Sequence, residues 1–165
     1  MWFWFLQVWQ DQIFGDVRLP KFVLVAFQDN TQYIGSYSAD CSTFKHLNVT
    51  ELTLSRGNDY SESYTQDFKA DKYVTSYVTS IIRNMGLLDR NLNCGIDMID
   101  FKDKYPFFTF VLAPDYDIHQ TQLPKQGNLN LKITFGGGIE EAASLIIYGV
   151  FDSEIQINKN RTIIM

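Results

Sequence analysis

The last third of the chain, from Tyr105 to Ile164, constrains the fold more than any other stretch. It consists of short runs of aromatic, β-branched and aliphatic residues, which are separated by Pro, Gly, Asp and Asn. Such runs between turn-forming residues are typical of the strands of a β-sandwich or barrel. The sequence therefore predicts an all-β fold in which antiparallel strands form a sandwich.

Two runs in this region predict how their strands are buried. From Leu129 to Phe135, apolar and polar residues alternate strictly, which predicts a strand with one wet face. The run from Leu145 to Phe151 is apolar on both faces, and we expect it to lie deep inside the protein. In the alternating strand we expect the inward side chains to be Leu129, Leu131, Ile133 and Phe135, and the outward ones to be Asn130, Lys132 and Thr134.

The first half of the chain predicts two further strands. A continuous apolar run from Phe22 to Phe27 follows Pro20 and predicts a strand buried on both faces, followed by turns at Asp29-Asn30 and Gly35-Ser36.

In the second of these strands, Leu47 and Val49 alternate in one phase, whereas Leu52 and Leu54 continue in the other. This change of phase predicts a β-bulge near Thr50-Glu51, or else a sharp bend. The residues from Arg56 to Asp59 predict the turn that ends the strand.

One helix is expected, from Asp71 to Gly86. Its apolar residues recur at helical spacing, with Asp71 as the N-cap and Gly86 as the C-terminal stop. Its many β-branched residues lower its helix propensity, so we expect packing against the sandwich to hold it. A membrane-surface role is disfavoured because only Lys72 and Arg83 provide basic groups.

Length and charge limit the classes of protein. A chain of 165 residues fits one domain, from Met1 to Met165, and can bury a core without a disulfide. Cys41 and Cys94 belong to no CxxC pair and are expected to be buried or incidental free thiols. The net charge of -5 provides no basic stripe, so we expect no direct nucleic-acid binding.

The segment from Met1 to Leu6 is apolar and rich in Trp, but it lacks a basic region and a cleavage site. It is also too short to span a membrane, so we expect neither a signal peptide nor a membrane span. We therefore expect an intracellular protein, and we expect the sequons at Asn48 and Asn160 to stay unmodified. The Trp-rich start is either a strand that covers a sheet or a boundary within a longer protein. Residues 1–13 are left without a place in the fold.

The sequence contains no recognisable pattern for catalysis or metal binding. Its two histidines, His46 and His119, are not spaced with carboxylates or cysteines as metal ligands would be, and His46 is expected to be structural. Asp115 and Asp117 lack the further oxygen ligands of a calcium loop. The remaining candidates are a glycine run, interpreted as an inter-strand connection, and an acidic pair, interpreted as solvated: Gly136-Gly137-Gly138 and Glu140-Glu141. We expect no catalytic residue, no cofactor, no metal and no enzymatic activity.

Several short blocks, taken in order, resemble one family. The blocks run from Phe14 to Lys21, from Asp29-Asn30 through Gly35-Ser36-Tyr37, from Thr43 to Val49, from Asp100 to Tyr105 with Ala113-Pro114-Asp115, from Gln126 to Leu129, and from Tyr148 to Asp152 with Asn160-Arg161-Thr162. Together they resemble the C-terminal portion of the double jelly-roll major capsid protein of Polinton (Maverick) elements, which are virus-like DNA transposons, and of its relatives in animal genomes. The resemblance covers residues 14–165, with Gly149 where the family usually has an acidic residue.

The resemblance implies a jelly-roll sandwich that serves as the second roll of a capsid subunit. It also implies a homotrimeric capsomer in the complete protein, contacts with other capsid proteins, and a location in the virion. An alternative from another class is a non-enzymatic β-sandwich that binds a ligand or carbohydrate through exposed tyrosines. The tyrosines in question are Tyr33, Tyr37, Tyr60 and Tyr64.

The shell hypothesis predicts self-association of the isolated chain. A jelly roll that lacks its neighbours should expose apolar surface, and burying such surface contributes about 25 cal/mol per Å². The segment from Trp2 to Phe5 is the expected main contributor. Removing Met1 to Trp9 is therefore expected to improve solubility.

Overall fold

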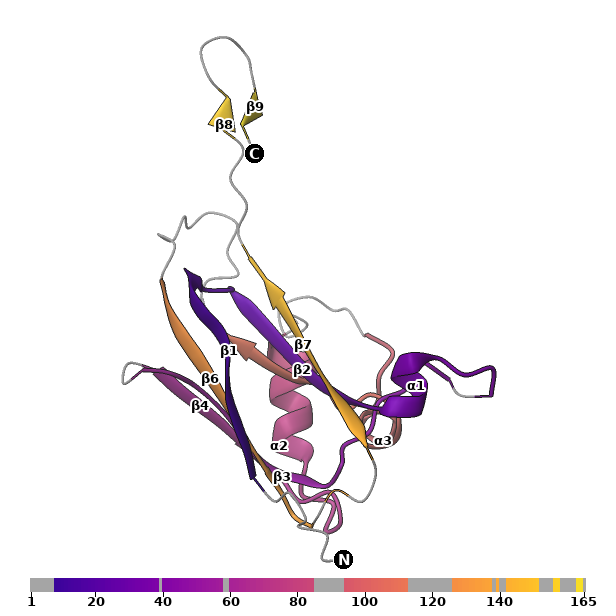
Figure 1. Cartoon of the computed structure of the whole chain (residues 1–165). Coiled ribbons are helices and arrows are strands. Elements are labelled where there is room, and N and C mark those ends of the chain that lie inside the picture. The colour runs from indigo at the N-terminus through magenta and orange to yellow at the C-terminus, as the bar shows by residue number, and fades with distance from the viewer. Residues whose placement is uncertain are drawn as a thin grey trace, which may run out of the picture.

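Antiparallel strands are the main element of the described chain, and seven of them form two sheets that pack face to face (Figure 1). The all-β sandwich predicted from the turn-separated apolar runs is confirmed. The computed structural model describes residues 8–38, 40–57, 60–84, 94–112, 126–137, 139, 142–151, 156–157 and 163–164.

The larger sheet has four strands in the order β1-β6-β3-β4. Its central strand β6 carries the strict alternation: Leu129, Leu131, Ile133 and Phe135 are buried, and the residues between them are exposed or half-buried, as predicted. The strands are β1 (Val8–Arg18), β6 (Gln126–Phe135), β3 (Val49–Arg56) and β4 (Tyr60–Thr65).

The smaller sheet has three strands in the order β5-β2-β7. The central strand β2 contains the apolar run after Pro20, and Val23, Val25, Ala26 and Phe27 are all buried. The predicted strand is confirmed, but its burial on both faces is confirmed only in part, because Phe22 and Leu24 on the second face are half-buried. The strands are β5 (Phe108–Val111), β2 (Phe22–Asp29) and β7 (Ala143–Val150).

The prediction for β7 is wrong. The run from Leu145 to Phe151 was expected deep inside the protein, but none of its residues is buried. The exposed fractions of Tyr148, Val150 and Phe151 are 60%, 41% and 42%. The reason is position, because among the described strands β7 has only one neighbour, β2, and therefore lies at the edge of its sheet.

The predicted bulge in β3 is confirmed. Val49 pairs with Phe135 and Glu51 pairs with Thr134, so the register against β6 shifts by one residue at Thr50. Leu47 belongs to a turn rather than to the strand, since Leu47 and Asn48 both have positive φ angles, 45° and 50°. The turn after Arg56 is present at Gly57, whose φ is 50°, and its next two residues lie outside the described part.

The predicted helix is present but shorter and less regular than expected. It consists of α2 (Val74–Tyr77), which continues as the π-helical segment η1 (Val78–Arg83). Asp71 is not its N-cap: the cap position is Tyr73, and Asp71 has a φ of 54° and forms an ion pair with Lys102. Gly86, the predicted stop, lies outside the described residues.

A short helix replaces the turn predicted at Asp29-Asn30. Helix α1 (Asn30–Ile34) begins where the Asp29 side chain accepts a hydrogen bond from the backbone of Thr31, and Gly35 ends it with a φ of 92°. The hydrogen bond from Lys45, and after it that from the Thr31 backbone, lowers the pKa of Asp29 to about 2. Another short helix, α3 (Met98–Asp103), precedes β5.

Aromatic rings join the two sheets across the core. Phe27 of β2 lies 6.1 Å from Phe135 of β6, and Tyr64 of β4 lies 5.1 Å from Phe110 of β5, measured between ring centroids. The second contact is edge to face, at 70°, which is a favourable geometry for aromatic pairs. The sheets therefore enclose one continuous core.

Part of the N-terminal segment that was left without a place belongs to the larger sheet. Residues 8–13 lie in β1, where Trp9 is opposite Ile133 and packs against the core. Whether the Trp-rich start is a strand that covers a sheet or a boundary within a longer protein stays a prediction. Residues 1–7 lie outside the described part.

The last two described strands pair only with each other. They are β8 (Gln156–Ile157) and β9 (Ile163–Ile164), and their small sheet stands apart from the sandwich in Figure 1.

Candidate functional site

His46 has a structural environment. Its ring stacks on Phe68 with the centroids 4.4 Å apart, and its Nδ1 accepts a hydrogen bond of 2.9 Å from the backbone of Asn48. Burial, and next the positive charge of Lys102, lower the pKa of His46. These contacts fix the turn that leads into β3, in line with the structural role expected for this histidine.

Within the described residues, no three His, Cys, Asp or Glu side chains gather where they could hold a metal ion. Gly136 and Gly137 follow β6 directly and begin the connection to β7, as predicted. Several other candidates lie outside the described part: His119, Asp115, Asp117, Gly138, Glu140 and Glu141.

The most extensive buried polar cluster surrounds Thr109 on β5. Thr109 donates its hydroxyl to Ser80 O at 2.9 Å, and its own carbonyl accepts from Asn84 Nδ2 at 2.6 Å and from the Tyr64 hydroxyl. Burial, and next the charge of Glu62, raise the pKa of Tyr64 well above its usual value, so the hydroxyl stays a neutral donor. Because these groups bond to one another, the cluster acts as a structural tie between helix, β4 and β5.

This tie covers one edge of the smaller sheet. The carbonyl and amide of Thr109 point away from β2, and the helix segment η1 with its following Asn84 supplies their partners. Unpaired strand edges attract other strands, and covering an edge with a helix is a common protection. The β5 edge of the sheet is therefore covered at Thr109.

The opposite edge of the same sheet, at β7, has no such cover among the described residues. The backbone of Asn30 donates to Ala142 O at 3.1 Å, and β2 and β7 keep one register along their whole length. In an antiparallel pair, successive residues point their backbone groups alternately toward and away from the partner strand. The backbone groups that point away from β2 are consequently those of Ala143, Leu145, Ile147 and Gly149.

The side chains of β7 divide between the two faces of the sheet. Leu145 and Ile147 pack against the core, whereas Tyr148 and Val150 lie on the outer face and are exposed. No charged residue occurs between Ala142 and Phe151. The edge is thus apolar on both faces, which sequence reasoning noticed but interpreted as burial.

Gly149 allows two aromatic rings to close the end of the sandwich beside this edge. Phe14 and Phe151 meet edge to face with centroids 5.6 Å apart. A Cβ on Gly149 would lie 3.0 Å from the ring of Phe14 and 3.1 Å from that of Phe151. The acidic side chain usual in the resembling family would therefore require both rings to move.

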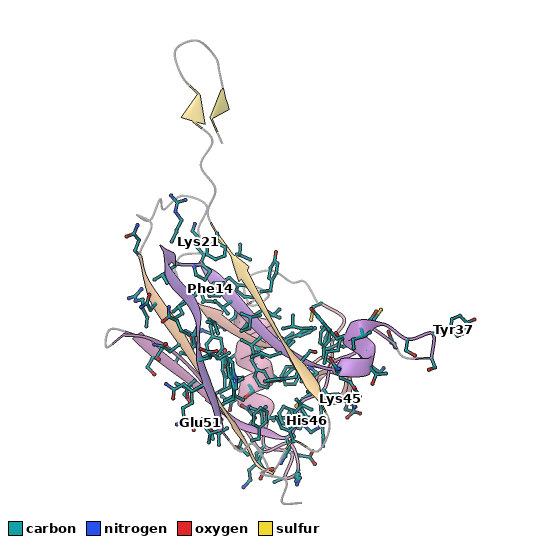
Figure 2. All side chains as sticks on the ribbon, viewed as in Figure 1. Phe14, Lys21, Tyr37, Lys45, His46 and Glu51 are labelled. Carbon is teal, nitrogen blue, oxygen red and sulfur yellow. The ribbon has the colours of Figure 1, made fainter. Side chains whose placement is uncertain are left out.

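The four tyrosines of the ligand-binding alternative do not form one surface. Tyr33 and Tyr37 are exposed on α1 and the loop after it, and Figure 2 shows Tyr37 pointing away from both sheets. Tyr64, by contrast, is buried, so its predicted exposure is wrong. Strand β4, which contains Tyr64 and begins at Tyr60, lies on the other side of the molecule from α1 (Figure 1).

A second apolar surface lies on two helices and was not predicted. Tyr77 of α2 contacts Phe101 of α3 at 5.5 Å between ring centroids, which places the helices side by side. Val74 of α2, Val78 of the following segment η1, and Met98 and Ile99 of α3 are exposed. The helical spacing of the apolar residues in the sequence predicts that Val74 and Val78 lie on the buried face of the helix, so for these two residues the prediction is wrong.

Both cysteines are free thiols, as expected, and both are exposed rather than buried.

Comparisons with protein-family models, with curated proteins and with solved structures find no match to this chain. No helix in the described part of the chain is long and apolar enough to cross a membrane.

Proposed function

We propose that this chain is a structural subunit of a virus-like shell, and that its sandwich is a jelly roll. In this proposal it performs no catalysis and needs no cofactor. It acts by contact with further copies of itself, as a trimeric capsomer in the complete protein, and with other capsid proteins of a virion.

The order of the strands carries the proposal. A jelly roll has eight strands, and numbered along the chain they form two sheets with the orders 2-7-4-5 and 1-8-3-6. We number β1 as the second strand of the jelly roll, so that β2 to β7 become the third to the eighth. The sheet β1-β6-β3-β4 then has the order 2-7-4-5, which is that of the first jelly-roll sheet. The order β5-β2-β7 then matches 6-3-8 of the second sheet, with the first place lying beside β7.

A further observation supports a shell. The molecule exposes apolar side chains on β7, on α2 with the following segment η1, and on α3. Exposed apolar surface of this kind is typical of proteins that bind other proteins. The sequence blocks from Phe14 onward add the resemblance to capsid proteins.

Electron microscopy combined with sedimentation of the purified chain tests the proposal. We expect regular oligomers, either trimers with a six-cornered outline or larger closed particles, that form at raised protein concentration. The matched comparison is a double substitution on the exposed helices, Val78→Glu with Ile99→Glu, against Lys69→Glu on an exposed turn. The helix variant should reduce particle formation, whereas the turn variant should not.

Ligand binding is the competing function, and the exposure of Tyr33 and Tyr37 favours it. A chain that forms no oligomers larger than two copies at any concentration, and that binds oligosaccharides in a Tyr37-dependent way, would overturn the shell proposal.

A further inference from the structure

The two edges of the smaller sheet are treated differently by the fold. At β5 the backbone of Thr109 is bonded to Ser80 and Asn84, so that edge is blocked to other strands at Thr109. At β7 the backbone groups of alternate residues point outward, from Ala143 to Gly149, and no described strand lies beside them. The open edge is eight residues long, about 26 Å at the usual rise per residue.

The β7 edge also lacks the features by which proteins normally prevent strands from pairing. Such edges usually carry charged side chains, proline or a bulge. Strand β7 contains no charged residue and no proline, and its pairing with β2 shows no register shift. A strand edge that is straight, apolar and uncharged favours hydrogen-bonded pairing with another strand of similar composition.

The sequence of β7 is complementary to itself when two copies run antiparallel. With Ile146 at the centre, Leu145 of one copy is opposite Ile147 of the other, and Ala143 is opposite Gly149. All four of these residues point their backbone groups outward, so they form the hydrogen-bonded pairs of an antiparallel ladder. On the core face, Leu145 and Ile147 then meet each other across the pair.

The outer face fits the same register. Ile146 of each copy lies opposite itself, and Tyr148 lies opposite Ser144. Directly opposite side chains of adjacent strands interact, and apolar pairs stabilise a sheet whereas like charges destabilise it. Because β7 carries no charge, the self-pairing brings no like charges together.

We propose that two copies of this chain associate through their β7 edges, with a two-fold axis at Ile146, to form one continuous six-stranded sheet. The interface is isologous, since the same strand serves on both copies. This inference rests on the edge of β7 and not on the shell function. In the jelly roll proposed above, the first strand takes the place beside β7. In the dimer the second copy's β7 takes that place, so the two arrangements exclude each other at this edge.

Charge substitutions at the two-fold axis test the proposal. Ile146→Lys places two lysines opposite each other, and Ile146→Glu places two glutamates there. Juxtaposed like charges cost several kcal/mol, so each variant should raise the dimer dissociation constant by about a hundredfold in sedimentation equilibrium. An equimolar mixture of the two variants should restore the dimer, because Lys then faces Glu.

Val8→Lys is the matched control. Val8 is an exposed apolar residue on β1, an edge strand of the other sheet. This variant should dimerise like the unmodified protein. Circular dichroism and thermal melting of each variant show whether it keeps the fold.

Hydrogen exchange of the unmodified protein provides a second measurement that needs no variant. The amides of Leu145, Ile147 and Gly149 should exchange more slowly as the concentration rises, whereas those of Ile146 and Tyr148, which bond to β2, should change little.

The proposal is overturned by any of three results. The first is a protein that stays monomeric at tens of micromolar. The second is association that persists in both charge variants, or that is lost only when residues 1–7 are removed. The third is a dimer whose outward β7 amides exchange at the same rate as in the monomer.

Discussion

The hydroxyl of Tyr64 joins three elements of the fold at the scale of a single residue. It donates to Thr109 O on β5 and accepts from Asn84, which follows the helix, while its own ring lies on β4. His46 is similar, since its ring stacks on Phe68 and its Nδ1 fixes the turn before β3. Both residues have groups that often serve in chemistry, but their described contacts are structural.

Tyr64→Phe should lower the free energy of unfolding by about 1–3 kcal/mol, because it leaves buried polar partners without their hydrogen bonds. The matched control is Tyr148→Phe, which removes a hydroxyl from a side chain that is 60% exposed. That control should change stability by less than about 0.5 kcal/mol. Urea unfolding measures both variants, and equal effects would show that the Thr109 cluster does not stabilise the protein.

His46 should make stability depend on pH below its ordinary pKa of 6.5. Burial lowers the pKa of His46 in the folded protein, so as the pH falls below 6.5 the unfolded chain takes up the proton first. The free energy of unfolding should therefore fall from pH 7 toward pH 5. His46→Phe keeps a ring against Phe68 but does not titrate, and urea midpoints across this range should show a weaker dependence for it. An unchanged dependence in the variant would assign the effect to other groups.

At the scale of elements, the sequence predicted what a strand contains better than where it lies. The alternation of β6 and the change of phase at Thr50 follow from a local pattern, because side chains of a strand alternate between its faces. The run in β7 contains the same kind of residues as the one in β2, yet only β2 lies between two strands. Whether a strand is central or at an edge depends on its partners, which its own residues do not encode.

The helix shows a similar division. The apolar spacing predicted that the helix exists, but its N-cap is Tyr73 and not Asp71. Asp71 has a positive φ and forms an ion pair with Lys102. The sequence did not predict the apolar surface at β7, because its continuous apolar run indicated a strand in the interior of the protein.

The helix should depend on packing rather than on its own propensity. Ile81 is completely buried, and Ile81→Ala should lower the free energy of unfolding by about 2–5 kcal/mol. Val78→Ala, on the exposed side of the same segment, should change it by less than about 0.5 kcal/mol. Chemical denaturation followed by circular dichroism distinguishes the two. Alanine is a better helix former than isoleucine or valine, so a gain in stability in both variants would mean that propensity, not burial, decides the stability of this helix.

At the scale of the whole molecule, the N-terminal start has two parts with different expected roles. Trp9 is opposite Ile133 and packs against the core, so removing Met1 to Trp9 also removes a core contact. The expected gain in solubility stays a prediction. The cut should fall before Val8, where the described sheet begins.

Removing residues 1–7 should change the free energy of unfolding by less than about 0.5 kcal/mol, whether or not it raises solubility. Removing residues 1–9 should lower it by about 1–3 kcal/mol, because a partly buried tryptophan and the end of a strand are lost. Thermal melts of the two truncated proteins and the full chain measure the difference. Equal melting temperatures for the two truncations would show that Trp9 adds nothing to the core.

The unequal edges of the smaller sheet determine its valence. A sheet with two open edges behaves like a bifunctional monomer and polymerises. A sheet with one capped edge has a single reactive end, so the growth of that sheet stops at two copies. In this protein the cap is the helix after Tyr73, held by Ser80 and Asn84 on Thr109. The helix therefore acts as a chain terminator, and conditions that detach it from β5 would convert a molecule that closes on one partner into one that propagates as a fibre.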